Sequence, residues 1–264
     1  MMKVLICVDM EGISGITKSE QVLRGDPEYQ HGRQYMAWDT NACVEGCFRG
    51  GATQVVVRDA HASGFNMLWE QIDSRAELTP GTGGRDQGRL FDVGQFDAMS
   101  LLGYHAMAGT PEAVLEHTMS SGGWQNFWLN GKKAGEIAMD AGIAGDDGVP
   151  TIMVSGCDKA CAEAKKWIKG VYTACVKKGL AWDSARLLGK EVAHKLISDT
   201  AEKACRNYKK VKPLVHAKPV RMRLELVERG KVPSPAAGMS YLKIVDARTY
   251  EVTGATTREA LSRL

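Results

Sequence analysis

The feature that most constrains the fold is a repeated layout in which a short aliphatic run ends in polar residues. The first run, 4–8, is followed by Asp9, Glu11 and Gly12, and similar runs occupy 53–57, 98–104 and 150–156. Continuous β-branched and aliphatic runs are typical of strands buried on both faces, as in parallel sheets. Segments with helical periodicity follow them. The sequence therefore predicts an α/β fold with a central, mostly parallel sheet flanked by helices.

Helix signals and turns complete the predicted element order. Asp26-Pro27-Glu28 predicts a helix start with Asp26 as the cap, and this helix should end near Gly50. Further helices are expected at 135–145, 158–167 and 184–208, a short helical turn after Thr110, and a hairpin around Asn130-Gly131. From residue 211 prolines and alternating residues predict strands at 220–226 and 241–245 and a helix at 257–264. We therefore divide the chain into an α/β domain, 1–210, and a small C-terminal αβ subdomain, 211–264.

Composition excludes several classes of protein. The net charge of the 264 residues is only +3, which implies neither nucleic acid nor an anionic membrane as a partner. No apolar stretch approaches the length of a membrane span, and no secretory leader pattern is present. The seven cysteines are odd in number and lack paired zinc-knuckle spacing, so we expect small buried residues in a reducing compartment. These features predict a cytoplasmic protein. We expect solvated side chains in the lysine pairs Lys165-Lys166, Lys177-Lys178 and Lys209-Lys210.

Two further patterns carry weak functional signals. The glycine-rich segment 80–88 could suggest a phosphate-binding loop, but it lacks the Lys-Ser/Thr ending of a P-loop. We interpret it as a surface loop or a loop flanking a site. His194, on a predicted helix, and His216, in a predicted linker, have no ligand-type neighbours in sequence and are expected at the surface.

Residues of the kind that bind metals follow the predicted strands. Asp9 and Glu11 follow the first strand, His61 the second and His105 the third, and Glu136 follows the predicted hairpin. In an α/β sheet, ligands bind beyond the carboxyl ends of the strands. Histidines at strand ends also occur as hydrogen-bonded core residues, and an aspartate there can simply cap a helix.

A set of two histidines and three carboxylates suits zinc, manganese or cobalt. Five ligands are too many for one tetrahedral catalytic ion but would supply two ions roughly 3.5–4 Å apart with a shared carboxylate. Asp9 is the expected bridge, because its short side chain stands directly at a strand end.

Four segments together resemble the DppA-type zinc-dependent D-aminopeptidases of peptidase family M55. They are 8–15, Asp59-Ala60-His61, 103–106 and Gly135-Glu136. The resemblance implies two zinc ions at the five residues named above, His117 as the catalytic nucleophile, and a homodecameric ring. In the family's Ser-x-Asp-x-Glu-Gly signature, Cys7 takes the serine position, which could alter hydrogen bonding around the metals.

The predicted function is metal-assisted removal of an N-terminal residue from short peptides and amides. The resemblance alone implies that this residue is a D-amino acid, such as D-Ala. His117 could be a nucleophile or a general base. Two alternatives stay open: a nucleotide- or phosphate-binding α/β protein that uses a divalent cation, and a metal-binding homologue without catalysis.

Overall fold

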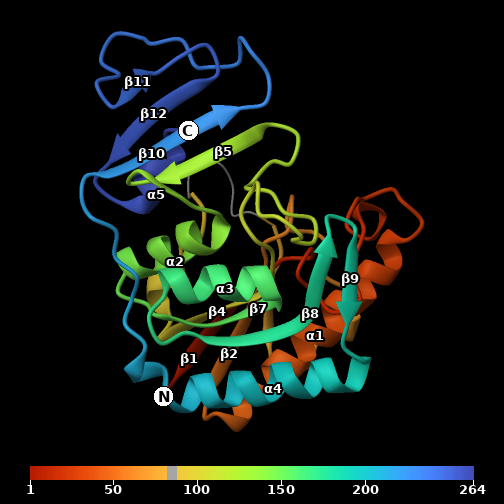
Figure 1. The fold of residues 1–264 in the computed structure, drawn as a ribbon. Coiled ribbons are helices and arrows are strands. Elements are labelled where there is room, and N and C mark those ends of the chain that lie inside the picture. The colour runs from red at the N-terminus through yellow and green to blue at the C-terminus, as the bar shows by residue number, and fades with distance from the viewer. Residues whose placement is uncertain (82–87) are drawn as a thin grey trace.

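A computed structural model describes residues 1–81 and 88–264. Its main sheet has the strand order β3-β2-β1-β4-β7-β8-β9 (Figure 1). All neighbouring pairs are parallel except the last, β8 with β9. The strands are β1 (Lys3–Val8), β2 (Gln54–Asp59), β3 (Glu77–Thr79), β4 (Ala98–Tyr104), β7 (Thr151–Cys157), β8 (Tyr172–Ala181) and β9 (Ser184–Leu187).

Helices cover both faces of this sheet. The two longest, α1 (Tyr29–Arg49) and α4 (Lys190–Arg206), pack against each other on one face, and α2 (Glu136–Asp146) and α3 (Asp158–Trp167) lie on the other (Figure 1). Single 3-10 turns occur at Ser19–Gln21, Trp69–Gln71, Val93–Gln95 and Tyr208–Lys210. The predicted fold class, a mostly parallel sheet flanked by helices, is confirmed.

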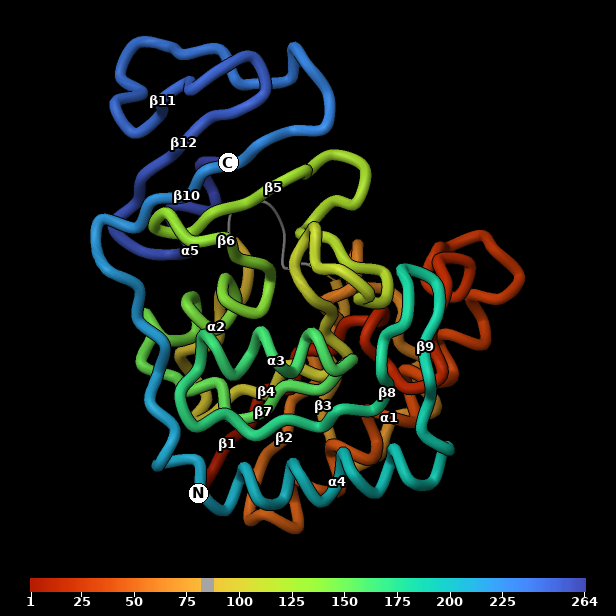
Figure 2. The backbone as a smooth tube through the Cα atoms, viewed as in Figure 1, coloured from red at the N-terminus to blue at the C-terminus, as the bar shows by residue number. Residues whose placement is uncertain are grey.

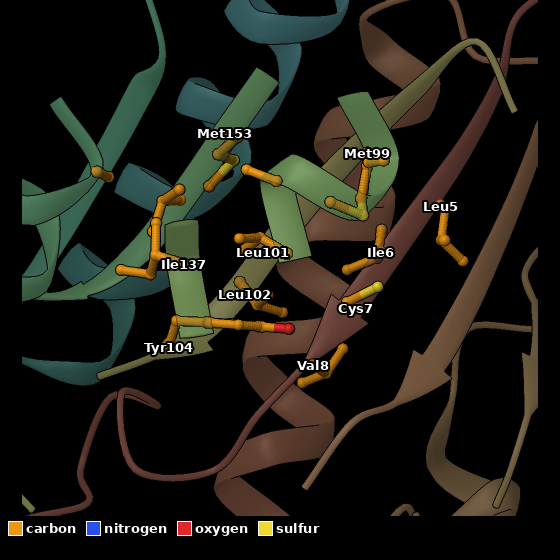
Figure 3. Close-up of a cluster of buried hydrophobic side chains, with 14 of the residues drawn as sticks. Leu5, Ile6, Cys7, Val8, Met99, Leu101, Leu102, Tyr104, Ile137 and Met153 are labelled. Carbon is orange, nitrogen blue, oxygen red and sulfur yellow. The ribbon is translucent and has the colours of Figure 1, made fainter. Parts of the chain in front are cut away.

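The core lies where β1 and β4 run side by side. Every residue of β4 and β7 is buried, as expected for central strands of a parallel sheet. Figure 3 shows Leu101 and Leu102 of β4 between Ile6 of β1 and Ile137 of α2. This packing fixes the ends of β1 and β4, from which the candidate site residues project.

A second, antiparallel sheet has the order β11-β12-β10-β5-β6. Its strands are β5 (Trp124–Leu129), β6 (Lys132–Lys133), β10 (Val220–Leu226), β11 (Leu242–Ile244) and β12 (Thr249–Gly254), and α5 (Thr257–Ser262) packs against β12 and β10. The β5–β6 hairpin comes from the middle of the chain and lies beside the C-terminal strands (Figure 2). The predicted Asn130-Gly131 turn is confirmed, with φ of 49° and 80° at the two residues, as a type I′ turn requires. The division at residues 210 and 211 stays a prediction.

Several element predictions were wrong in detail. The helix expected at 184–208 begins only at Lys190, because Ser184–Leu187 pairs with β8 as a strand. The helical turn expected after Thr110 is a series of turns with left-handed residues at Glu112 and Leu115. Helix α1 begins at Tyr29 with Glu28 as its N-cap, while Asp26 accepts a hydrogen bond from the Glu28 N–H. Strands β3 and β12 were not predicted.

Within the described ranges, no helix combines the length and the apolar character needed to cross a membrane. Most of the glycine-rich loop predicted at 80–88 lies outside the described residues. Six of the seven cysteines are buried, as predicted, and Cys175 is partly exposed; all seven are free thiols.

Candidate active site

The five predicted ligand residues meet at one edge of the main sheet. Strand β1 lies between β2 and β4, and in register Val8 stands beside Asp59 on one side and Leu102 on the other. Asp9 therefore emerges next to the ends of both neighbouring strands, from which His61 and His105 follow. Glu136 joins them as the first residue of α2.

Gly12 is required by the close packing of the loop that carries Asp9 and Glu11. A Cβ atom at Gly12 would lie 2.0 Å from the carbonyl oxygen of Tyr104, well inside contact distance. The Gly12 N–H instead donates to the Gly103 carbonyl at 2.7 Å. The loop is thus fixed directly against the end of β4.

His61 faces two carboxylates. Its Nδ1 lies 3.1 Å from Asp9 Oδ1 and 3.1 Å from Glu11 Oε2. Its Nε2 lies 3.0 Å from the Val22 carbonyl oxygen, which can only accept, so this nitrogen carries the proton. In the neutral ring, Nδ1 therefore presents its lone pair to two anionic oxygens, and this arrangement calls for a cation between them.

His105 repeats this arrangement on the other side of Asp9. Its Nδ1–H donates to the Ala106 carbonyl at 3.0 Å. Its Nε2 lies 3.4 Å from Asp9 Oδ2 and 3.3 Å from Glu136 Oε1. This buried Nε2 makes no hydrogen bond to any residue that the structure describes. A buried ring nitrogen that faces carboxylates in this way, with its other nitrogen bonded to a carbonyl, is typical of a metal-binding histidine.

His117 also belongs to this cluster. Its ring stacks on that of His105, with centroids 4.0 Å apart and an interplanar angle of 13°. Its Nδ1–H donates to the Leu115 carbonyl at 2.9 Å, and its Nε2 lies 4.0 Å from Glu136 Oε1. Ligand atoms of His105, His117 and Glu136 lie close enough to share one ion, as do those of Asp9, Glu11 and His105.

Opposite charges shift the pKa values of these groups. Burial favours the neutral form of each group, but the charged neighbours outweigh it. The pKa of Glu11 lies well below its usual range because of His61, and that of Glu136 falls to about 2 beside His105. Glu11 and Asp9 raise the pKa of His61 well above its usual range, and Glu136 and Asp9 raise that of His105 to about 10. The carboxylates thus demand positive charge at both rings, from protons or from metal ions.

The donor set fits zinc. Each of the three histidines gives one ring N–H to a backbone carbonyl and turns its other nitrogen towards carboxylates. This fixes the tautomer and orients the free nitrogen, as is usual for histidines that bind zinc.

A cleft of about 690 Å³ opens over the cluster. Four of the candidate ligands, Asp9, Glu11, His61 and Glu136, line it together with His117 and Arg89. Arg89 pairs with Asp140 and lies 3.3 Å from Glu136 Oε2. No sequence pattern pointed to Arg89, because its partners lie on α2, far along the chain. The large apolar lining residues are Val22, Leu23, Leu115, Met119 and Trp182.

Three expectations for residues outside the ligand set were wrong. His216 is buried and donates to the Ala138 carbonyl at 3.0 Å. His194 is half-buried, and its Nε2 lies 3.3 Å from the buried Asp39. Lys177 was expected to be solvated but is 1% exposed. Each of these side chains is covered by elements far away in sequence.

Cys7 lies buried in β1 and points into the core (Figure 3). Burial raises the pKa of its thiol, so the thiol stays protonated. Among the described residues, it belongs to neither group of candidate metal ligands. The cysteine that replaces the family serine is therefore a core residue.

The chain is similar to known D-aminopeptidases in sequence and in fold. The sequence model of the Peptidase_M55 family, described as D-aminopeptidase, matches residues 2–264. A D-aminopeptidase of Bacillus subtilis (strain 168) is 35% identical over 218 residues, which are 81% of this chain and 77% of that protein. The solved structure of the Zn-dependent D-aminopeptidase DppA from Bacillus subtilis, a self-compartmentalizing protease, superposes with a TM-score of 0.91 at 30% identity. It covers 99% of this chain and 95% of that one.

Proposed function

The chain belongs to the M55 family of D-aminopeptidases, which are zinc-dependent peptidases, and we propose that it removes N-terminal D-residues from short peptides and amides at a site for two zinc ions. One ion would bind to Asp9, Glu11 and His61, and the other to Asp9, His105 and Glu136. Manganese or cobalt could replace zinc at such a donor set.

The observation that carries this proposal is the position of Asp9. Its Oδ1 faces the ring nitrogen of His61, and its Oδ2 faces that of His105. Each histidine has already given its other N–H to a backbone carbonyl. A carboxylate whose two oxygens face two such nitrogens is arranged to bridge two ions.

The residues around the cluster have separate roles in the proposed reaction. Bound zinc would supply Lewis acidity to the scissile carbonyl and to an attacking water. Met119 N–H donates to Glu136 Oε1 at 2.8 Å, and Arg89 approaches Oε2, so this carboxylate is held in place. His117 presents a free Nε2 beside it and would act as nucleophile or as general base.

The proposal is tested by a panel of D- and L-aminoacyl amides and dipeptides, assayed on zinc-replete protein whose metal content has been measured. We expect about two zinc ions per chain and hydrolysis of D-substrates such as D-Ala-D-Ala in preference to their L-isomers. Two bound zinc ions without hydrolysis would identify a non-catalytic homologue. Magnesium binding with nucleotide affinity would instead support a phosphate-binding protein.

We also infer that the chain assembles into a homo-oligomer, because its self-compartmentalizing relative is so similar in fold. The family resemblance implies a homodecamer. Large apolar side chains on the surface support assembly: Trp69 is 77% exposed and Phe65 and Val192 are each 59% exposed. Native mass spectrometry tests this proposal, and a monomer at micromolar concentration would contradict it.

A further inference from the structure

Lys177 is a buried lysine whose ammonium group lies inside the loop that carries two of the candidate ligands. It belongs to β8, and its side chain is 1% exposed. Its Nζ donates to three backbone carbonyl oxygens: that of Glu11 at 2.6 Å, that of Ile13 at 2.8 Å and that of Ile16 at 2.6 Å. The acceptors lie more than 160 residues away in sequence.

The three contacts fully satisfy the ammonium group. A lysine ammonium has three N–H donors, and each has a carbonyl acceptor here. Burying a charge without such partners would be very costly. Burial lowers the pKa of Lys177 to about 8, so the group is still mostly charged at neutral pH.

The loop also needs the ammonium group. Carbonyl oxygens that converge on one point repel one another, so the segment from Glu11 to Ile16 can adopt this curl only around a cation or a set of N–H donors. The loop has two other attachments: the Gly12 N–H donates to the Gly103 carbonyl at 2.7 Å, and the Ser14 N–H and hydroxyl donate to the Asp39 carboxylate at 2.8 Å and 2.5 Å. Lys177 is the residue whose side chain donates a hydrogen bond to the carbonyl of Glu11.

We propose that Lys177 is a positioning residue for the metal site: by holding the Glu11 carbonyl, it sets the backbone from which the Glu11 carboxylate reaches the ion beside His61. This inference rests on the proposed function for the identity of the metal. Loss of Lys177 should weaken only the ion beside His61, because Lys177 contacts the backbone of Glu11 and not that of His105 or Glu136.

The test compares Lys177→Met with Lys178→Met as the matched control, since Lys178 is the next residue of β8 and is exposed. Zinc affinity is measured by chelator competition. Co²⁺ is titrated in parallel, because its visible absorption reports the ligand geometry. We expect Lys177→Met to bind one of the two ions about 10–100-fold more weakly, the usual cost of removing a group that orients a metal ligand, with a changed Co²⁺ spectrum. Lys178→Met should match the wild type, and Lys177→Arg, which keeps a charged donor, should restore part of the affinity.

A Lys177→Met protein with lowered thermal stability but wild-type zinc affinity and Co²⁺ spectrum would overturn the inference, since the lysine would then serve the fold alone. If Lys177→Met does not fold, the ¹⁵N resonance of the Lys177 ammonium is followed in the wild type, with and without zinc. We expect it to shift on loading, and an unchanged resonance overturns the inference. These experiments measure metal binding and not hydrolysis. If the protein failed to hydrolyse D-peptides, the proposed function would be wrong, but the role of Lys177 in metal binding could still be tested.

Discussion

Replacing Asp9 with asparagine tests the bridging arrangement most directly. The substitution keeps the size of the side chain and an oxygen that can accept the Met10 N–H, now bonded to Asp9 Oδ1 at 2.9 Å. It removes the negative charge, turns one ligand oxygen into an amide nitrogen, which does not bind zinc, and leaves the other as a neutral amide oxygen, a much weaker zinc ligand, so neither ion keeps the Asp9 carboxylate. Because the two oxygens face different histidines, we expect both ions to be affected.

The expected loss follows from the number of ligands. Apparent binding free energies of about 10–16 kcal/mol for four-ligand structural zinc sites correspond to about 2.5–4 kcal/mol per ligand. At 1.4 kcal/mol for each factor of ten, losing one ligand weakens binding by about 10²–10³-fold. Asp9→Asn should therefore lower both zinc affinities by about 10²-fold or more, whereas Glu11→Gln should lower only one.

The assay is elemental analysis after dialysis against graded chelator concentrations, with Glu11→Gln as the comparison variant. Retention of both zinc ions at wild-type affinity in Asp9→Asn would refute the bridging assignment. Loss of a single ion would show that Asp9 binds only one.

Four further predictions concern titratable groups in and near the site. His117→Ala should keep both metals and the fold but lose about 10²-fold or more in kcat, which is the usual effect of removing a positioned acid–base group. If the zinc-replete variant turns over substrate at nearly the wild-type rate, His117 has no catalytic role. In the metal-free protein, the protonated His105 contributes stability below about pH 6.5, its unfolded pKa, and this is lost as pH rises through its folded pKa of about 10. Zinc affinity should instead rise with pH, because zinc replaces protons on His61 and His105. Calorimetry of zinc binding in buffers of different ionisation heat should detect the released protons. Zinc binding without proton release would contradict histidine ligation. Burial raises the pKa of Glu163, which accepts the Met107 N–H, to about 7, so its ionised form costs stability as pH rises from about 4.5. Between pH 5 and pH 8, the free energy of unfolding of Glu163→Gln, measured with urea, should rise by about 1–3 kcal/mol relative to that of the wild type. A difference between the two proteins that does not change with pH would contradict this prediction.

Sequence reasoning located the candidate ligands because they obey a local rule. Asp9 and His105 directly follow aliphatic runs, and the carboxyl ends of parallel strands meet at one edge of the sheet. The same reasoning missed β9, because Ser184–Leu187 continues without a break into a helical pattern and becomes a strand only by pairing with β8. It also placed Lys177 in solvent, since a lysine pair has the composition of an exposed surface.

The residues that orient the candidate ligands are hard to find for a physical reason. His61, His105 and His117 are each fixed by a hydrogen bond to a backbone carbonyl. Lys177 likewise binds only carbonyls. Every residue has a backbone carbonyl, so the amino-acid types at the accepting positions do not reveal these hydrogen bonds. Carboxylates and imidazoles, in contrast, can be recognised from the residue type. The residue types of the candidate ligands can therefore be predicted from sequence. The orientation of their side chains depends on which backbone carbonyls the fold brings next to them. In the loop from Glu11 to Ile16 the carbonyls converge on the ammonium group of Lys177, which comes from a strand more than 160 residues later in the chain.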